Sequence, residues 1–299
     1  MKWRKLGQII EPNPAIPWMS SCAGPTFVKL EEKVMRVYMS GRDEQNVSRI
    51  GTVDVDLGDM KTIVQVSKEP VFDIGDPGCF DESGVSYPWL VDDGSRTLLY
   101  YVGWIAGGLG SFINTPGVAE AHAGESFRRI SRAPMLERTG AEPIGAGSVC
   151  VLREAEQWKM WYTSFDRWER VGTGLKHFYC IKFATSTDGL HWHRPGLMCI
   201  TYKDATEYAI AKPCVLRRNG RYEMWYSYRG PFYRIGFALS EDGVNWTRQD
   251  KAAGITVSES GWDSEMVEYA HVFEFQDTQF MTYNGNQFGR TGVGLAVLE

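Results

Sequence analysis

The 299-residue sequence predicts an all-β fold, a five-bladed β-propeller with four antiparallel strands in each blade. The first observation is a near-repeat, since FATSTDGLHW at 183–192 returns as FALSEDGVNW at 237–246. The second is an aromatic, strand-forming segment before each copy, WKMWYTS at 158–164 and YEMWYSY at 222–228. The third is that five such units of about 60 residues account for the whole chain.

Each unit is expected to start with an innermost strand, and we align these strands on Pro25, Pro88, Ser148, Pro213 and Val272. The second strands are expected at 34–40, 97–103, 158–164, 222–228 and 279–285. The third strands are expected at 49–55, 117–123, 180–186, 234–240 and 292–298. In the two best copies Asp188-Gly189 and Asp242-Gly243 follow, and Asp-Gly suits a tight hairpin because the turn needs positive φ. A fourth strand led by Trp or Phe completes the unit.

The fifth unit ends after its third strand, at Glu299. Residues 2–10, KWRKLGQII, have the character of the missing strand, so the N-terminal strand is expected to close the last blade. A division into two domains would cut a regular repeat. We therefore expect residues 1–299 to form a single domain.

Composition indicates an ordinary globular protein, with 43% hydrophobic and 23% charged residues. The net charge of −5 without any Lys/Arg run argues against a nucleic-acid or membrane-surface partner. No segment approaches the roughly 20 apolar residues of a membrane span, and no signal-peptide pattern is visible. The six cysteines are scattered without a C-x-x-C pair. These features predict a reduced, cytoplasmic protein without a metal site or cofactor.

Strand alternation places the starts of the innermost strands and the loops after the second strands on one face of the propeller. Carboxylates recur there in register: Glu82, Glu142 and Glu207 stand six residues before the aligned positions, and Glu265 stands seven before. Four acids around a narrow channel would repel one another, which raises some of their pKa values and suits acid–base chemistry. Solvated, inert loop glutamates are the alternative.

The loops after the second strands carry residue types that suit a sugar site. Aromatic faces stack on sugar rings, and planar polar groups fix hydroxyls. The candidates are Arg42, Asp43, Trp104, Arg229, Asn286 and Arg290. Tyr87, Lys212 and His271, each one residue before its aligned position, are expected to line the channel wall, although a buried structural role is an equal alternative for His271.

Taken together, these features resemble the five-bladed propeller glycosidases. That group includes the arabinanase and β-xylosidase families, the invertases and the β-mannoside phosphorylases. The resemblance rests on the MWYS-type second strands, the S-x-D-G-x-x-W turn and the acids before the innermost strands, and it covers the whole chain. The final segment, SEMVEYAHVFEF…YNGNQFGRTGVGLA, also resembles glycosidase-like propeller proteins of uncharacterised activity.

The resemblance implies a general base in the first unit, a pKa-tuning Asp in the second and a Glu acid in the third. Glu142 matches the acid, and Asp81 or Glu82 matches the second-unit carboxylate. The first unit departs from this pattern, because residues 19–21, Met-Ser-Ser, stand where the base belongs. Two acids in neighbouring loops are the available substitutes, Asp43 and Glu265.

We therefore expect a carbohydrate-active enzyme that cleaves or transfers a glycosidic bond of a small glycoside or oligosaccharide. Two carboxylates would do so with inversion. The departure in the first unit leaves two alternatives open. One is a glycoside phosphorylase or glycosyltransferase that lacks a general base, and the other is a non-catalytic sugar-binding propeller.

Overall fold

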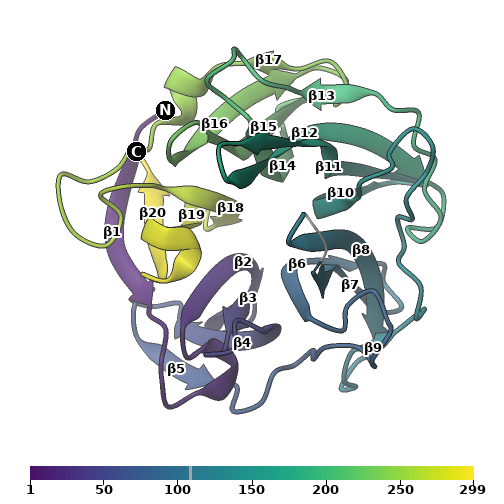
Figure 1. Ribbon diagram of the computed structural model, residues 1–299. Coiled ribbons are helices and arrows are strands. Elements are labelled where there is room, and N and C mark those ends of the chain that lie inside the picture. Colours follow the sequence, from purple (N-terminus) through teal and green to yellow (C-terminus); the bar gives the residue numbers. More distant parts are fainter. Residues whose placement is uncertain (108–109) are drawn as a thin grey trace.

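The computed structural model describes residues 1–107 and 110–299, which form twenty strands and three short 3₁₀ helices (Figure 1). The first ten strands are β1 (Trp3–Ile10), β2 (Cys22–Leu30), β3 (Val34–Arg42), β4 (Ser48–Asp56), β5 (Ile63–Val66), β6 (Gly84–Asp92), β7 (Thr97–Ala106), β8 (Phe112–Ala121), β9 (Arg128–Arg129) and β10 (Ala146–Glu154). The others are β11 (Gln157–Val171), β12 (Gly174–Ser186), β13 (Met198–Ile200), β14 (Ala209–Arg218), β15 (Arg221–Arg229), β16 (Tyr233–Ser240), β17 (Thr247–Arg248), β18 (Glu268–Phe275), β19 (Thr278–Asn284) and β20 (Val293–Leu298). The 3₁₀ helices are η1 (Pro17–Met19), η2 (Asp250–Ala253) and η3 (Asn286–Gly289). None of the helices that the described residues form has the length and apolar character of a membrane-spanning segment.

The strands form three sheets. One sheet has the order β2-β3-β4-β6-β7-β8-β9 with β5 on β4, and another has the order β10-β11-β12-β14-β15-β16-β17 with β13 on β12. The third sheet, β1-β20-β19-β18, joins the two ends of the chain through the antiparallel pair β1 and β20. Within the two larger sheets, β4 meets β6 and β12 meets β14 through a single parallel residue pair each.

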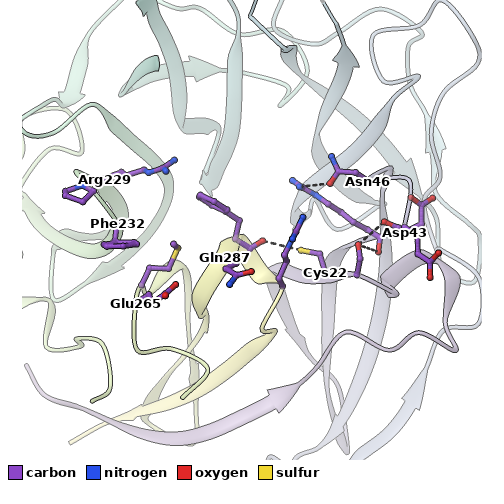
Figure 2. Close-up of a pocket in the computed structure, with 14 residues that line it drawn as sticks. Cys22, Asp43, Asn46, Arg229, Phe232, Glu265 and Gln287 are labelled. Carbon is purple, nitrogen blue, oxygen red and sulfur yellow. Dashed lines mark hydrogen bonds between the residues drawn. The ribbon is translucent and has the colours of Figure 1, made fainter. Parts of the chain in front are cut away.

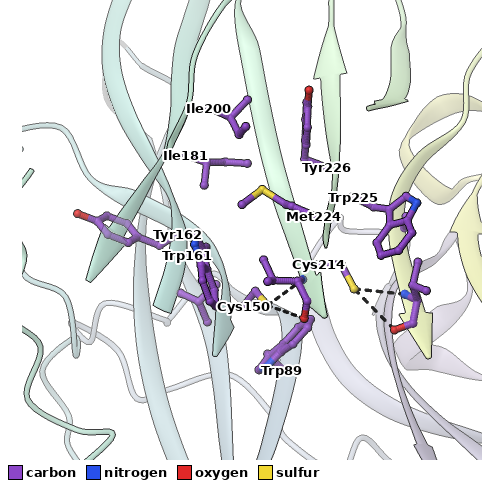
Figure 3. Packing of buried hydrophobic residues seen from close by; sticks show 14 of the residues in the cluster. Trp89, Cys150, Trp161, Tyr162, Ile181, Ile200, Cys214, Met224, Trp225 and Tyr226 are labelled. Atoms are coloured by element: carbon purple, nitrogen blue, oxygen red, sulfur yellow. Dashed lines mark hydrogen bonds between the residues drawn. The ribbon is translucent and has the colours of Figure 1, made fainter. Parts of the chain in front are cut away.

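Five strands face the centre of the ring, β2, β6, β10, β14 and β18 (Figure 1). Each of them contacts the next one around the ring, and β18 contacts β2. The buried side chains fill the space between neighbouring groups of strands. Figure 3 shows part of this core, in which Trp161, Met224 and Trp225 are completely buried.

The repeated Asp-Gly turn has a structural role, as its sequence predicts. Gly189 and Gly243 adopt positive φ values of 75° and 80°, which favour glycine. The Asp188 carboxylate accepts backbone N–H bonds from residues 190 and 191 at 2.8 Å each. The carbonyl of Gly189 accepts a hydrogen bond from the Tyr100 hydroxyl at 2.9 Å. This bond connects the turn to β7 in the preceding group of strands. The carbonyl of Gly243 likewise accepts a hydrogen bond from Trp161.

Each innermost strand contains a β-bulge at the level where the central site begins. In β6, β14 and β18 the bulge holds a non-glycine residue at positive φ, Tyr87 (55°), Lys212 (52°) and Tyr269 (57°). Each backbone N–H at these positions donates to a serine hydroxyl of the preceding group of strands. The pairs are Tyr87 with Ser40 at 2.8 Å, Lys212 with Ser148 at 3.0 Å and Tyr269 with Ser227 at 2.7 Å. The serines thus hold a backbone conformation that is otherwise unfavourable.

The bulges correct the alignment of the fifth unit. They begin at Ser86, Ala211 and Glu268, so Ala270 rather than Val272 corresponds to Pro88 and Pro213. Tyr269, not His271, therefore stands at the level of Tyr87. The sequence misplaces this strand by two residues because it contains no proline to mark the bulge.

Ser227→Ala tests the role of the serine bond. Ser227 is completely buried, and its loss leaves the Tyr269 N–H without an acceptor. We expect the free energy of unfolding to fall by about 1–3 kcal/mol, measured by denaturant titration. Ser264→Ala, which removes a hydroxyl that is bonded only within an exposed turn, is the control and is expected to change stability little. An equal loss in both variants would refute a special role for Ser227.

Candidate functional site

Two adjoining cavities lie where the innermost strands begin. The outer cavity, or mouth, has a volume of about 750 Å³ and is largely polar. Figure 2 shows Arg229, Phe232 and Glu265 on one side of the mouth, with Asp43 on the other. The inner cavity, or chamber, has a volume of about 210 Å³. The two cavities share three lining residues, Arg42, Arg229 and Phe288.

The chamber is lined mainly by aromatic rings. They are Tyr87, Trp104, Phe112, Phe165, Tyr179, Tyr233, Tyr269 and Phe288, with His177 beside them. The β11–β12 hairpin carries Phe165, His177 and Tyr179, and it is longer than its counterparts in the other repeats. His177 stacks on Tyr179 with ring centroids 5.0 Å apart, and burial followed by the charge of Arg229 lowers its pKa to about 4. Apart from Arg42 and Arg229, the chamber is therefore lined by aromatic and other uncharged side chains, which suit the apolar face of a ring-shaped ligand.

Glu268 lies directly behind this wall, at the start of β18. Its side chain is completely buried, and neither carboxyl oxygen has a partner at hydrogen-bonding geometry among the residues that the structure describes, although the Tyr269 side chain is near enough to influence its pKa. Burial raises the pKa of Glu268 well above its usual value, against the opposing effects of Arg229, Tyr269 and Arg42. Burial therefore favours the protonated, neutral form of this carboxyl group.

Sequence reasoning missed Glu268, although a signal was present. The corresponding bulge positions in the second and fourth units are small, Ser86 and Ala211. A charged residue inside the apolar segment MVEYAHV is conspicuous at such a position. The two-residue misalignment of the fifth unit concealed it.

Arg42 is the last residue of β3 and Arg229 is the last residue of β15, and both line the mouth and the chamber. Trp104 and Tyr87 line the chamber only. Arg229 lies against Phe288, 5.0 Å from the ring centroid. Arg42 lies over Trp104 at 5.8 Å. The expectation that these four residues gather at the centre of one face agrees with the structure.

Glu142 occupies a different environment from the one expected. Its buried carboxylate accepts hydrogen bonds from Tyr162 (3.0 Å), Ser164 (2.7 Å), Lys182 (3.1 Å) and Arg194 (2.9 Å). Burial alone would raise the pKa of Glu142, but the Ser164 bond and the Lys182 charge outweigh it, so the pKa is lowered. The expected upward shift is therefore wrong, because this acid is held as an anion.

The arrangement around Glu142 recurs in other repeats as a carboxylate joined to a second-strand tyrosine and to a cation. Asp81 contacts Tyr101 (3.0 Å) and Arg129 (2.7 Å), and Asp263 contacts Tyr283 (3.0 Å) and Lys5 (2.6 Å). Asp250 contacts Tyr226 and Arg248 (2.7 Å). Arg248 also pairs with Glu207 (2.8 Å). The acids in register thus do not repel one another around a channel. Glu142 and Glu207 are ion-paired within their own repeats, and in the second and fifth repeats Asp81 and Asp263 are paired in place of Glu82 and Glu265.

The remaining candidates divide between the mouth and the supporting loops. Asp43, Glu265 and Arg290 line the mouth, and Asp43 is paired with Arg49 at 2.6 Å. Glu82 accepts a backbone hydrogen bond from Gly78 at 2.6 Å. The side chain of Asn286 accepts the backbone N–H groups of residues 265 and 266, so it shapes the loop.

Lys212 and His271 lie in the core instead of lining either cavity. Both are almost completely buried, and Lys212 Nζ lies 5.4 Å from the ring centroid of Trp89. His271 packs against Phe27 at 4.7 Å, and burial together with Lys212 lowers its pKa well below the usual value. The expectation that they line the wall is wrong for these cavities. His271 does not line a cavity because the register of β18 places Tyr269 at the level of Tyr87 instead. Lys212 does not line a cavity because its side chain extends toward Trp89 in the core.

Within the described residues no group of three or more His, Cys, Asp or Glu side chains is arranged to hold a metal ion.

No protein-family model matches the sequence. Two proteins of Mycobacterium tuberculosis, the uncharacterized proteins MT1551 and Rv1502, are each 40% identical over 300 residues and are matched over 100% of both chains. The chain belongs to their family.

Solved structures show which fold this family has. A glycoside hydrolase superposes with a TM-score of 0.81 at 15% identity over 99% of this chain and 91% of that chain. A structure of the GH130 family of mannoside phosphorylases, which contains glycoside hydrolases, has a TM-score of 0.75 at 14% identity over 99% and 93%. A thermostable family-43 glycoside hydrolase has a TM-score of 0.66 at 14% identity over 96% and 91%. The chain therefore has the all-β propeller fold of the glycosidases that its sequence resembles.

Glu142→Gln tests the structural role of the acids in register. We expect the variant to lose about 1–3 kcal/mol of unfolding free energy at neutral pH, because Lys182 and Arg194 lose a buried anion. The folded-state pKa is lowered, so this contribution is present above the ordinary value of 4.5 and disappears as the pH falls through the folded-state pKa.

The measurement is denaturant unfolding of wild type and variant across acidic and neutral pH. Glu169→Gln, which removes an exposed partner of Arg167, is the control and is expected to cost less than about 1 kcal/mol. A difference for Glu142→Gln that grows as the pH falls would contradict the account.

Proposed function

We propose that the protein is a carbohydrate-active enzyme that cleaves or transfers a glycosidic bond, with Glu268 as the proton donor. The observation that carries the proposal is the unpaired, buried carboxyl group of Glu268 behind an aromatic chamber. Buried polar groups in folded proteins nearly always have partners, and an orphan group calls for a functional explanation. A leaving glycosidic oxygen would supply the missing partner.

The chemistry requires an acid that is still protonated at the working pH. Burial of Glu268 favours its protonated form, whereas the hydrogen bond from Ser164 and the charge of Lys182 favour the anion of Glu142. We therefore assign the acid role to Glu268 in place of Glu142. Glu265, exposed in the mouth, is the better candidate for a base than Asp43, because Arg49 already holds Asp43.

Access to Glu268 would require a lining side chain to move. Phe288 lines both cavities and is 37% exposed. It and Gln287 both have positive φ, 59° and 58°, which is unfavourable for non-glycine residues and is typical of functional loops. We propose that this loop rearranges when a sugar enters and brings the reacting oxygen to Glu268.

A second candidate is transfer of the glycosyl group to an acceptor other than water, such as phosphate or another sugar. It is favoured by the charges that act on Glu268, which come from Arg229 and Arg42 and not from a second carboxylate. A non-catalytic sugar-binding propeller is the alternative of a different class. It would use the same aromatic chamber without proton transfer.

The architecture we propose is one domain of five blades. The two single-pair parallel bridges divide the larger sheets into β2–β5, β6–β9, β10–β13 and β14–β17, and β18–β20 with β1 form the fifth set. A reducing compartment such as the cytoplasm is supported by six free cysteines, of which four are buried. The proposed ligand is a small glycoside or oligosaccharide.

Glu268→Gln tests the proposed reaction. We expect kcat/KM to fall about 10²- to 10⁴-fold while the affinity for the sugar changes little, because the amide fills the same space but donates no proton. The measurement is turnover of a panel of disaccharides, whose sugar leaving groups require protonation, with and without added phosphate, alongside calorimetric binding of the best substrate.

Glu274→Gln is the matched control, since Glu274 lies on the same strand but is exposed. Its turnover should equal that of the wild type. Unchanged turnover in Glu268→Gln would refute the acid role. Glycosides that bind to the wild type without any turnover would favour the sugar-binding alternative.

A further inference from the structure

We propose that Arg42 and Arg229 form a site for an oxyanion, carried either by the sugar substrate itself as a carboxylate or phosphate group or by free inorganic phosphate. The proposal rests on the proposed function for the statement that a sugar ring occupies the chamber. The anion site itself is argued from the arginines.

The arginines of the mouth differ from most of the others in the chain. Arginines elsewhere typically pair with carboxylates, as Arg129 does with Asp81 at 2.7 Å. Arg42, Arg229 and Arg290 line the mouth and have no carboxylate partner among the described residues. Arg42 donates only to the side-chain amide of Asn46, at 3.1 Å. Three uncompensated guanidinium groups at one opening are unexpected in a protein of net charge −5.

Arg229 is held in a way that leaves its donors free. Its guanidinium lies 5.4 Å from the ring centroid of Tyr208, 5.3 Å from that of Tyr233 and 5.0 Å from that of Phe288. Aromatic neighbours stabilise the cation without accepting its N–H groups in the plane of the guanidinium. The Nε atom is buried and has no hydrogen-bond partner in the described part of the chain. A carboxylate or phosphate group bound through two parallel hydrogen bonds would satisfy this donor set.

The acids nearby do not neutralise these cations. Asp43 is committed to Arg49 and to the backbone N–H of Val47. Glu268 makes no ion pair with either arginine among the described residues, and its burial favours the neutral form. Of the described acids that line the mouth, this leaves Glu44 and Glu265. A ligand anion would complete the charge balance beside the chamber.

The position of the two arginines indicates the class of ligand. Both line the chamber as well as the mouth, so they stand at the boundary between an aromatic space and a polar one. A ring in the chamber with an anionic substituent directed to the mouth matches both surfaces. Sugar acids and sugar phosphates have this form, and a free phosphate beside a neutral sugar presents the same groups.

The test is calorimetric titration of the full-length protein with glucose, glucuronate, glucose 6-phosphate and inorganic phosphate. We expect at least one charged ligand to bind more tightly than glucose, and Arg229→Gln and Arg42→Gln each to weaken it roughly 10- to 100-fold. Arg138→Gln, which removes an exposed arginine outside both cavities, is the control and should bind as the wild type does. Unfolding curves of the variants establish that they remain folded.

The outcomes separate the two sources of the anion. Binding of a charged sugar without binding of inorganic phosphate places the anion on the substrate, and phosphate binding that both arginine variants abolish identifies free phosphate. Equal binding of glucose and all charged ligands, or charged-ligand binding that survives in both arginine variants, overturns the proposal while leaving the proposed function intact. Charged-ligand binding together with full turnover by Glu268→Gln would instead uphold the anion site and refute the acid role.

Discussion

A buried carboxyl group must either meet cations and hydrogen-bond donors or remain protonated, and the architecture of this protein depends on how that requirement is met. For Glu142 the cations are Lys182 and Arg194, which belong to the same repeat. The Asp263 set draws its cation, Lys5, from the opposite end of the chain. These ion pairs tie the loops that enter the innermost strands to the outer strands of the same repeat. They connect strands within each repeat, and for Glu142 they also lower the pKa of the carboxyl group.

Glu268 meets the same requirement in the other way. Its carboxyl oxygens have no hydrogen-bond partner among the described residues, and burial favours the neutral form by raising the pKa. The bulge in β18 places it there, and the bond from the Tyr269 N–H to Ser227 holds that bulge. Had the strand lacked the bulge, the alternation of side chains would have turned Glu268 to another face. The position of the proposed acid is thus a consequence of strand register.

The sequence was sufficient to predict the all-β class, the Asp-Gly turns and the gathering of Arg42, Trp104 and Arg229, because these features follow from local patterns and from strand direction. The partners of the acids could not be predicted. Glu142 and Arg194 are 52 residues apart, and Lys5 and Asp263 are 258 apart, so the contacts depend on the three-dimensional arrangement. Recurrence in register does not mark one shared environment, because Glu142 and Glu207 are ion-paired whereas Glu265 lines the mouth. Glu268, which lies outside the pattern of acids in register, is the buried acid without a cationic partner among the described residues.

The protonation state of Glu268 is the central claim, and infrared difference spectroscopy tests it most directly. The spectrum of the wild type minus that of Glu268→Gln isolates the carboxyl group without any substrate. The account predicts that the carbonyl band of a protonated carboxylic acid persists well above the pH at which a glutamate ordinarily titrates, because burial raises the pKa of Glu268. A carboxylate signal at neutral pH, with no protonated band above the ordinary titration range of a glutamate, would contradict it.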